Sequence, residues 1–252
     1  MNKVKKVVVS LAIIAFWLGL WQALALVVGS EFLLPGIPST LKALQAVLCE
    51  SKFYISLLFT LLRVLGGFAI SVLIGSLLAF LSYRYNLVYK FFSPLISVMK
   101  STPVASFAIL LWFALGGDAH TVVISFLMVM PIIFQNVYDG FKAINKELSE
   151  ACDVFEFSFK KRMKLLVLPS VFAYFIPAVI TGISFAWKAG IAAEIIGYTK
   201  NSIGELINDA KFTPPDTARI FALTLVIILL SVALEKLIKF LLTRLRERSI
   251  YI

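Results

Sequence analysis

Long apolar segments alternate with short polar ones along the chain. Six of them meet the length of roughly 20 residues that crosses about 30 Å of hydrocarbon: residues 7–29, 56–82, 92–116, 121–138, 167–190 and 219–241. This pattern predicts an all-α polytopic membrane protein, with about six transmembrane helices in a single membrane domain over residues 1–252. The first segment is too long for the apolar part of a signal peptide, so we expect it to remain as a helix.

Two connections on the outer side of this bundle are long enough to hold structure. Residues 30–55 predict a short amphipathic helix along the membrane surface, with Ser39 or Thr40 as its N-cap. Residues 191–218 are too polar to span a membrane and too short to fold alone. We expect this second segment to pack back on the bundle.

Composition and charge support a membrane protein and indicate its orientation. Of the 252 residues, 60% are hydrophobic and 15% charged, unlike a soluble domain. The net charge of +10 does not indicate nucleic-acid binding, because the basic residues cluster beside apolar segments. With the N-terminus in the cytoplasm, sixteen Lys and Arg residues lie inside and five outside, so the positive-inside rule predicts that both termini are cytoplasmic. Cys49 and Cys152 then lie on opposite sides, where we expect small packing residues and neither a disulfide nor a metal site.

One cytoplasmic stretch, residues 145–166, has the polarity of a soluble helix pair. A first helix is predicted from Asn145, with acidic residues Glu147 and Glu150 near its positive end. Ser158 is a predicted N-cap for a second, basic helix. A solvated loop with basic side chains at the lipid headgroups is the alternative.

The spacing in this stretch resembles the EAA signature of inner-membrane permeases of binding-protein-dependent ABC importers. Glu150, Ala151 and Cys152 stand at the EAA positions, and Leu166, Leu168 and Pro169 follow at the spacing of the motif's final hydrophobic and Leu-Pro positions. The family's glycine position holds Glu156, where a left-handed turn would be strained. Further similarity, to the subfamily for alkanesulfonates, taurine, nitrate and related small anions, lies in "SLLFTLLRVLGGFAIS", "KSTPVASFAILLWFALG" and "AAEIIG".

The resemblance implies an ABC importer permease fold in a bacterial inner membrane, in which residues 145–166 form coupling helices that dock on a cytoplasmic ATPase. The coupling residues it implies are Glu147, Glu150, Ala151, Cys152, Glu156, Ser158, Leu168 and Pro169. It also implies a second permease copy, two ATP-binding subunits and an external solute-binding protein. The solute would be a small anion or a compound resembling a vitamin precursor.

No phosphate-binding loop or hydrolase motif occurs in the sequence. We therefore expect no catalysis and no cofactor in this chain, and ATP hydrolysis on a separate subunit. An ion-coupled secondary transporter is the alternative function, and a structural or assembly factor of the membrane is a third.

Charged residues within apolar segments are costly and are candidates for function. Lys100, Ser101 and Thr102 precede Pro103, which breaks helices, so these four residues are candidates for a translocation path. The alternative is that Lys100 marks the inner end of its span.

The fifth span ends with a second charged pair, Lys188 and Glu194, which are further path candidates. They share a helix face only if the helix breaks near Gly190, and they would then pair with each other or with another chain. Otherwise Lys188 offers a cation to an anionic solute. Trp187 is expected at the interface or in packing.

Three further expectations concern the outer half of the bundle and its packing. Arg63 is expected to extend to the outer surface, and His120 to occupy a surface turn. Small residues every four positions form one helix face, which favours close packing within the chain or, alternatively, a dimer seam: Gly67, Ser71, Gly75 and Ala79.

Overall fold

The computed structural model describes residues 3–212 and 215–251, and within these residues it contains helices and no β-strand. The elements in chain order are α1 (Lys3–Val28), α2 (Ile37–Cys49), α3 (Ser51–Arg84), α4 (Asn86–Ser101), α5 (Val104–Leu115), α6 (Ala119–Lys142), α7 (Lys146–Val154), α8 (Phe159–Arg162), the π-helical segment η1 (Met163–Val167), α9 (Leu168–Gly197), α10 (Ile203–Phe212) and α11 (Thr217–Tyr251). The predicted all-α membrane fold is confirmed.

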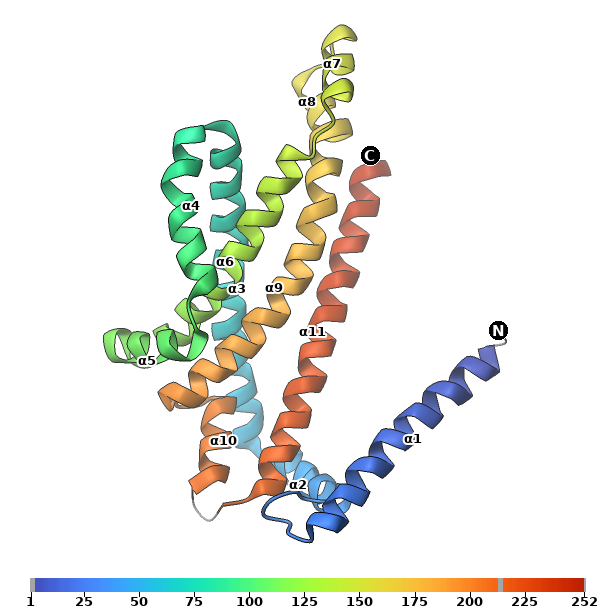
Figure 1. The fold of residues 1–252 in the computed structure, drawn as a ribbon, viewed down its shortest axis with the longest axis vertical. Coiled ribbons are helices and arrows are strands. Elements are labelled where there is room, and N and C mark those ends of the chain that lie inside the picture. Colours follow the sequence, from blue (N-terminus) through green and yellow to red (C-terminus); the bar gives the residue numbers. More distant parts are fainter. Residues whose placement is uncertain (1–2, 213–214, 252) are drawn as a thin grey trace.

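Five described helices, α1, α3, α6, α9 and α11, are long and apolar enough to cross a membrane. The pair α4 and α5 adds a sixth crossing if it counts as one bent span. Helices α3, α6 and α9 form the centre of the bundle, and α11 runs along α9 (Figure 1). Their shared core includes Phe68, Ile133, Phe134 and Ile183.

The small residues of α3 serve packing within the chain. A side chain at Gly67 would place its Cβ 2.4 Å from the Val122 carbonyl oxygen, so α3 and α6 approach each other closely only because this residue is glycine. One turn later, the Ser71 hydroxyl is shared between the Gly67 carbonyl of its own helix at 2.7 Å and the Phe126 carbonyl of α6 at 3.1 Å. Ser71 and Ala79 are fully buried. The alternative of a dimer seam on this face is therefore wrong.

The predicted single span 92–116 is two helices, because α4 and α5 meet at an angle of 105°. The break lies at Pro103, as the sequence indicated: proline lacks a backbone donor, and Thr102 before it is extended, with ψ 126°. Side-chain hydroxyl groups donate hydrogen bonds to backbone carbonyls at the end of α4. Thr102 Oγ1 donates to the Val98 carbonyl at 2.7 Å, and Ser101 Oγ donates to the Ser97 carbonyl at 3.1 Å.

Helix α1 stands apart from the bundle and is joined to it at the α2 end (Figure 1). The Ile37 amide of α2 donates to Gln22 Oε1 at 2.8 Å, so a side chain of α1 caps α2. The N-cap position of α2 is Gly36, and the predicted caps Ser39 and Thr40 are wrong because α2 begins three to four residues earlier than they imply.

The segment after α9 packs back on the bundle as α10, as expected. The predicted break near Gly190 is wrong, since α9 continues to Gly197. Gly190 instead allows close packing on α3, because an added Cβ would lie 2.5 Å from Val64 Cγ2. The cysteines lie in α2 and α7 at opposite ends of the molecule, and both are free thiols (Figure 1). Cys152 is buried as expected, but Cys49 is exposed, so its predicted packing role is wrong.

Candidate functional site

A helical hairpin, α7 and α8 with their caps (residues 145–163, the α7–α8 hairpin), projects from one end of the bundle (Figure 1). Its helices begin at side-chain caps, because the Leu148 amide donates to Asn145 Oδ1 at 3.2 Å and the Lys161 amide donates to Ser158 Oγ at 3.4 Å. The predicted N-cap at Ser158 is confirmed. Each cap satisfies an amide that the first helical turn leaves without a partner.

The turn between the two hairpin helices is left-handed at Glu156, with φ 49°. The Phe157 amide donates to the Cys152 carbonyl at 2.9 Å, and the Glu156 amide donates to the Asp153 carbonyl at 3.1 Å. This pair of bonds is the Schellman motif that ends many helices, with its usual glycine replaced by glutamate. The turn keeps its shape although a side chain there costs roughly 1–2 kcal/mol.

An ion pair and a hydrogen bond join the two helices of the hairpin. Arg162 of α8 donates to Asp153 Oδ1 at 2.6 Å and to the Ser149 hydroxyl, both on α7. Cys152 on the inner side of α7 is 8% exposed. The hairpin is therefore internally bonded, and η1 joins it without a loop to α9, whose first residues are Leu168 and Pro169.

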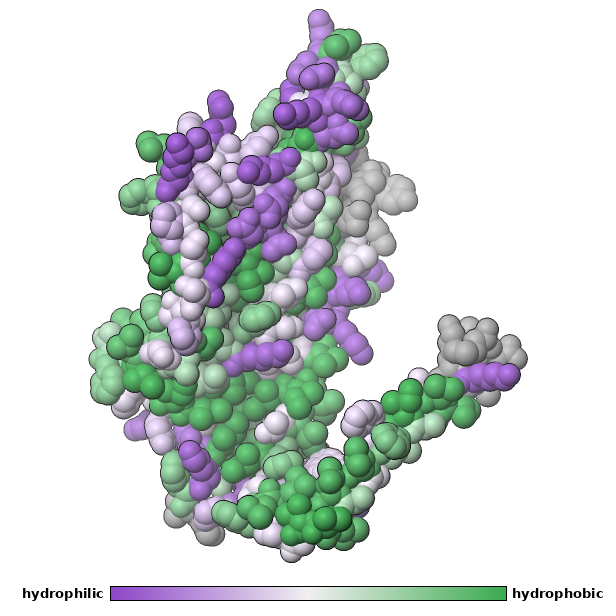
Figure 2. Space-filling view, in the orientation of Figure 1, coloured by the Kyte–Doolittle hydropathy of each residue, from purple (hydrophilic) through white to green (hydrophobic). Residues whose placement is uncertain are grey.

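The tip of the hairpin exposes large apolar side chains among charged ones. Val154, Phe155 and Phe159 are 79%, 72% and 78% exposed. Glu147 and Glu150 are also exposed, and hydrophilic residues dominate this end of the molecule (Figure 2). Apolar side chains exposed beside polar ones mark surfaces that bind another protein or a membrane.

A second polar feature crosses from α4 to α6 near the helix break. Lys100 Nζ donates to Gln135 Oε1 at 3.1 Å, and Gln135 Nε2 donates to both carboxylate oxygens of Asp139 at 3.1 Å. Hydrophilic residues gather on this face over α6, between α4 and α9 (Figure 2). The structure thus brings the predicted path residue Lys100 to two residues that the sequence analysis missed. Their signal was two polar residues four positions apart at the end of an apolar segment.

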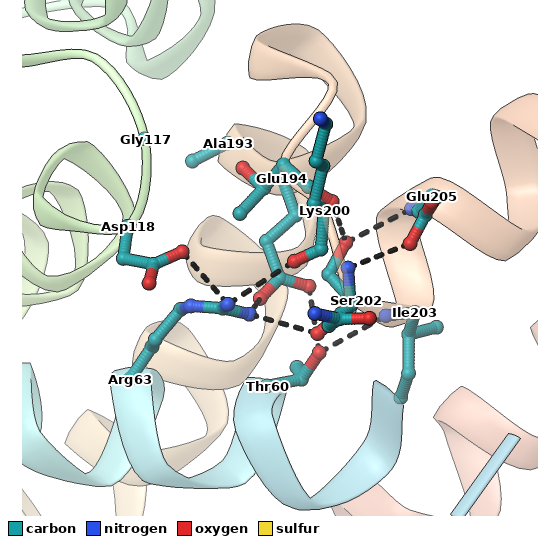
Figure 3. Close-up of polar contacts among 12 residues, drawn as sticks. Thr60, Arg63, Gly117, Asp118, Ala193, Glu194, Lys200, Ser202, Ile203 and Glu205 are labelled. Carbon is teal, nitrogen blue, oxygen red and sulfur yellow. Dashed lines mark hydrogen bonds and ion pairs between the residues drawn. The ribbon is translucent and has the colours of Figure 1, made fainter. Parts of the chain in front are cut away.

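A third polar cluster lies at the ends of α3 and α9 that are far from the α7–α8 hairpin, on the side that the positive-inside rule predicts to be outer, and we call it the outer network. Thr60 and Arg63 of α3 point toward Glu194 of α9, and Asp118 stands on the other side of the guanidinium group (Figure 3). Arg63 Nη2 lies 2.7 Å from Asp118 Oδ1, and Nη1 lies 3.4 Å from Glu194 Oε1. Thr60 Oγ1 donates to Glu194 Oε2 at 2.8 Å.

The expectation that Arg63 extends to the surface is wrong, since its side chain is 8% exposed. The guanidinium group also donates to the carbonyls of Lys200 and Asn201 at 3.1 Å, in the turn that leads to α10. Two carboxylates and two carbonyls compensate for the loss of water around a buried cation. Arg63 therefore joins α3, the α5–α6 turn and the α9–α10 turn.

The predicted pairing of Lys188 with Glu194 is also wrong. Glu194 is fully buried among partners from α3, while Lys188 is exposed. Because α9 has no break between them, residues six positions apart project from different faces. Trp187 packs inside the bundle, where its indole donates to the Ile227 carbonyl at 3.0 Å.

His120 is fully buried, so its predicted surface role is wrong. Its Nδ1 lies 2.6 Å from the Gly117 carbonyl, and its Nε2 lies 3.0 Å from the Ala193 carbonyl. The ring therefore connects the start of α6 to α9. Among the described residues, no group of three His, Cys, Asp or Glu side chains forms a possible metal site.

Residues 71–247 match the family model described as "Binding-protein-dependent transport system inner membrane component". The chain belongs to this family. It is therefore a permease subunit of an ABC importer, and such permeases are not themselves catalytic.

Two curated relatives and one solved structure resemble this permease. The formylaminopyrimidine transport permease protein ThiX of Halalkalibacterium halodurans is 27% identical over 180 residues, which cover 71% of this chain and 70% of the relative. The putative aliphatic sulfonates transport permease protein SsuC of Bacillus subtilis is 19% identical over 197 residues, 77% of this chain and 71% of the relative. A crystal structure of an amino acid ABC transporter with histidines superposes with a TM-score of 0.60 at 17% identity, covering 78% of this chain and 94% of that one. This last likeness concerns the fold alone.

Proposed function

We propose that the α7–α8 hairpin is the docking surface for an ATPase that drives import through this permease. The observation that carries the proposal is the exposed apolar tip, formed by Val154, Phe155 and Phe159, on an internally bonded hairpin. Glu147 and Glu150 add exposed negative charge beside it. Ala151, Cys152, Glu156 and Ser158 shape the hairpin through its helix packing, turn and cap.

The path for mechanical coupling follows from chain continuity. From Phe159 the chain remains helical through η1 into α9, where Leu168 and Pro169 begin the membrane helix. A displacement of the hairpin is therefore passed to α9 and to the partners that α9 contacts. Helices transmit such movements because their backbone hydrogen bonds keep them stiff.

The complex we propose contains two copies of this permease, two cytoplasmic ATP-binding subunits and an external solute-binding protein in a bacterial inner membrane. In this arrangement the hairpin and both termini face the cytoplasm, in keeping with the excess of basic residues on that side. The ATP-binding subunits would supply the phosphate-binding loop that this sequence lacks. The external binding protein would supply the solute receptor.

The translocation path of this proposal passes the break between α4 and α5. Lys100, Ser101, Thr102 and Pro103 lie there, and the exposed Lys188 remains a second path candidate. Glu194 lines no open path in the described structure, because the outer network encloses it. The solute class is a small anion or a heteroaromatic vitamin-precursor-like compound. The similarity to permeases named for aliphatic sulfonates and formylaminopyrimidine supports both.

The test uses the complex of permease, ATPase and binding protein in proteoliposomes. Replacing an aromatic anchor that an interface buries weakens binding by about tenfold or more. Phe155→Ser removes such an anchor, and Glu150→Arg reverses an exposed charge beside it. Both variants are expected to abolish ATP-driven uptake and to release the ATPase during purification. Phe91→Ser on α4 is the matched control, because Phe91 is 74% exposed but lies away from the hairpin. Normal uptake and normal retention of the ATPase by Phe155→Ser would exclude docking at this tip. Uptake that follows an ion gradient without ATP would favour a secondary transporter.

A further inference from the structure

The hydrogen-bonded chain formed by Lys100, Gln135 and Asp139 places an amide between opposite charges. The Gln135 carboxamide presents its oxygen to the ammonium group of Lys100 and its nitrogen to the carboxylate of Asp139, each at 3.1 Å. None of the three side chains is fully buried: Lys100 is exposed, and Gln135 and Asp139 are half-buried. A polar group that enters from this face can therefore reach the bonds that Gln135 now makes.

The two charges act together on anything that approaches the amide. A group that only accepts hydrogen bonds, such as a sulfonate, is attracted by Lys100 and repelled by Asp139. A group that only donates meets the reverse situation. A group with an acceptor and an N–H donor side by side satisfies both residues, as the carboxamide does.

The helices that carry this chain also provide an apolar surface. Residues of α4, α5 and α6 line a cavity of about 230 Å³ near the helix break, where Thr102 is the one lining residue with a hydroxyl group. The other lining residues are Leu95, Val98, Met99, Phe107, Phe126, Leu127, Met128 and Met130. Lys100, Gln135 and Asp139 do not line this cavity, so recognition at this face depends on the hydrogen-bonded chain alone.

We propose that Lys100 and Asp139 form a recognition site for an amino-substituted nitrogen heterocycle, whose acceptor–donor edge takes the place of the Gln135 carboxamide. The ring nitrogen accepts from Lys100, and the adjacent amino group donates to Asp139, while Gln135 turns aside. The site thereby selects between the two solute classes left open above, against simple anions. The inference rests on the proposed import function and assigns a substrate class to its path.

The experiment measures direct binding to the permease–ATPase complex in lipid nanodiscs by saturation-transfer NMR. The probes are cytosine, which has the acceptor–donor edge, pyrimidin-2-one, which lacks the amino group, and methanesulfonate, which only accepts. Cytosine is expected to bind most tightly. Losing one charge-assisted hydrogen bond weakens binding by about tenfold or more, which is the effect expected for Lys100→Met, for Asp139→Asn and for the probe without the amino group.

A Gln135→Ala variant separates this site from a structural role. Because Gln135 competes with the solute for both partners, its removal is expected to leave cytosine binding unchanged or stronger, whereas a merely structural glutamine would weaken it. Asn136→Ser is the control, since Asn136 bonds only to the Ile132 carbonyl of its own helix among its described contacts. It is expected to bind cytosine as the wild type does.

Three results would overturn the site: no cytosine binding up to about 10 mM, tighter binding of methanesulfonate, or unchanged cytosine binding in Asp139→Asn. Stimulation of ATP hydrolysis by the binding protein is measured on the same complex. If that stimulation is present while cytosine fails to bind, the substrate class is wrong and the importer function stands. If stimulation is absent in the wild type, the proposed function itself fails.

Discussion

The substitution Gly67→Ala tests whether the contact between α3 and α6 limits how closely the bundle can pack. The new Cβ would lie 2.4 Å from the Val122 carbonyl oxygen and 2.8 Å from Ser125 Cβ. Neither neighbour can rotate away, because one belongs to the backbone of α6 and the other is bonded directly to it. The helices must therefore move apart by about 1 Å to restore an ordinary contact near 3.4 Å.

The cost of this movement follows from the interface that it disturbs. Overpacking a close contact typically costs about 1–3 kcal/mol, and the rigid neighbours of Gly67 favour the upper part of that range. The separation also stretches the bond from Ser71 to the Phe126 carbonyl, one turn along the same interface. We therefore expect a loss of about 3 kcal/mol in the free energy of unfolding.

The matched control is the neighbouring glycine. A Cβ at Gly66 meets nothing within 4 Å, so Gly66→Ala is expected to change stability by less than about 1 kcal/mol. The assay is reversible unfolding of the purified permease in mixed micelles, with helix content followed by circular dichroism. Equal stability of the two variants would show that α3 and α6 have room to adjust and would refute the argument from close packing.

Three further predictions concern two polar contacts and one strained turn. Arg63→Met is expected to cost about 3–5 kcal/mol in the same unfolding assay, because it leaves the Glu194 carboxylate buried without a cation; adding Glu194→Gln should recover part of the loss, and strictly additive effects would deny the pairing. Glu156→Gly is expected to stabilise the α7–α8 hairpin by about 1 kcal/mol through relief of its positive φ, seen as slower hydrogen exchange of the hairpin amides; faster exchange would contradict the strain. The hydrogen bonds from Arg219 hold the pKa of Glu50 below its usual value, so this contact stabilises the fold above the unfolded-state pKa of about 4.3 and is lost as pH falls through the lower folded value. Unfolding temperature should therefore fall less with acidification in Glu50→Gln than in the wild type, and parallel profiles would exclude this linkage.

Local chemistry accounts for the features that the sequence predicted correctly. The apolar segments, the break at Pro103 and the cap at Ser158 each depend on residues within a few positions of one another. Gly67 also belongs to this group, because the four-residue spacing of small side chains indicates a packing face without identifying the partner helix. The Schellman turn at Glu156 shows how far such local rules extend, since its backbone bonds persist although the preferred glycine is absent.

Several of the wrong predictions concern which distant residue a polar side chain meets. Arg63 and Glu194 are 131 positions apart, and His120 and Ala193 are 73 apart. No spacing rule connects such residues, because the rotation of each helix about its axis and the depth at which the helices pack decide whether side chains meet. Gln135 and Asp139 were visible as polar residues at the end of an apolar segment, but their link to Lys100 depends on how α4 packs against α6.

By itself, the sequence determined that this protein is a helical membrane permease with a polar hairpin, because apolar length, charge asymmetry and caps act over short stretches of chain. Only the tertiary structure decided that Arg63 is buried between two carboxylates, so that Glu194 meets Arg63 and not Lys188. It also decided that Lys100 meets the amide of Gln135. In an apolar bundle, each buried charge is stable only beside its partners. The packing of α3, α6 and α9 decides which partners those are.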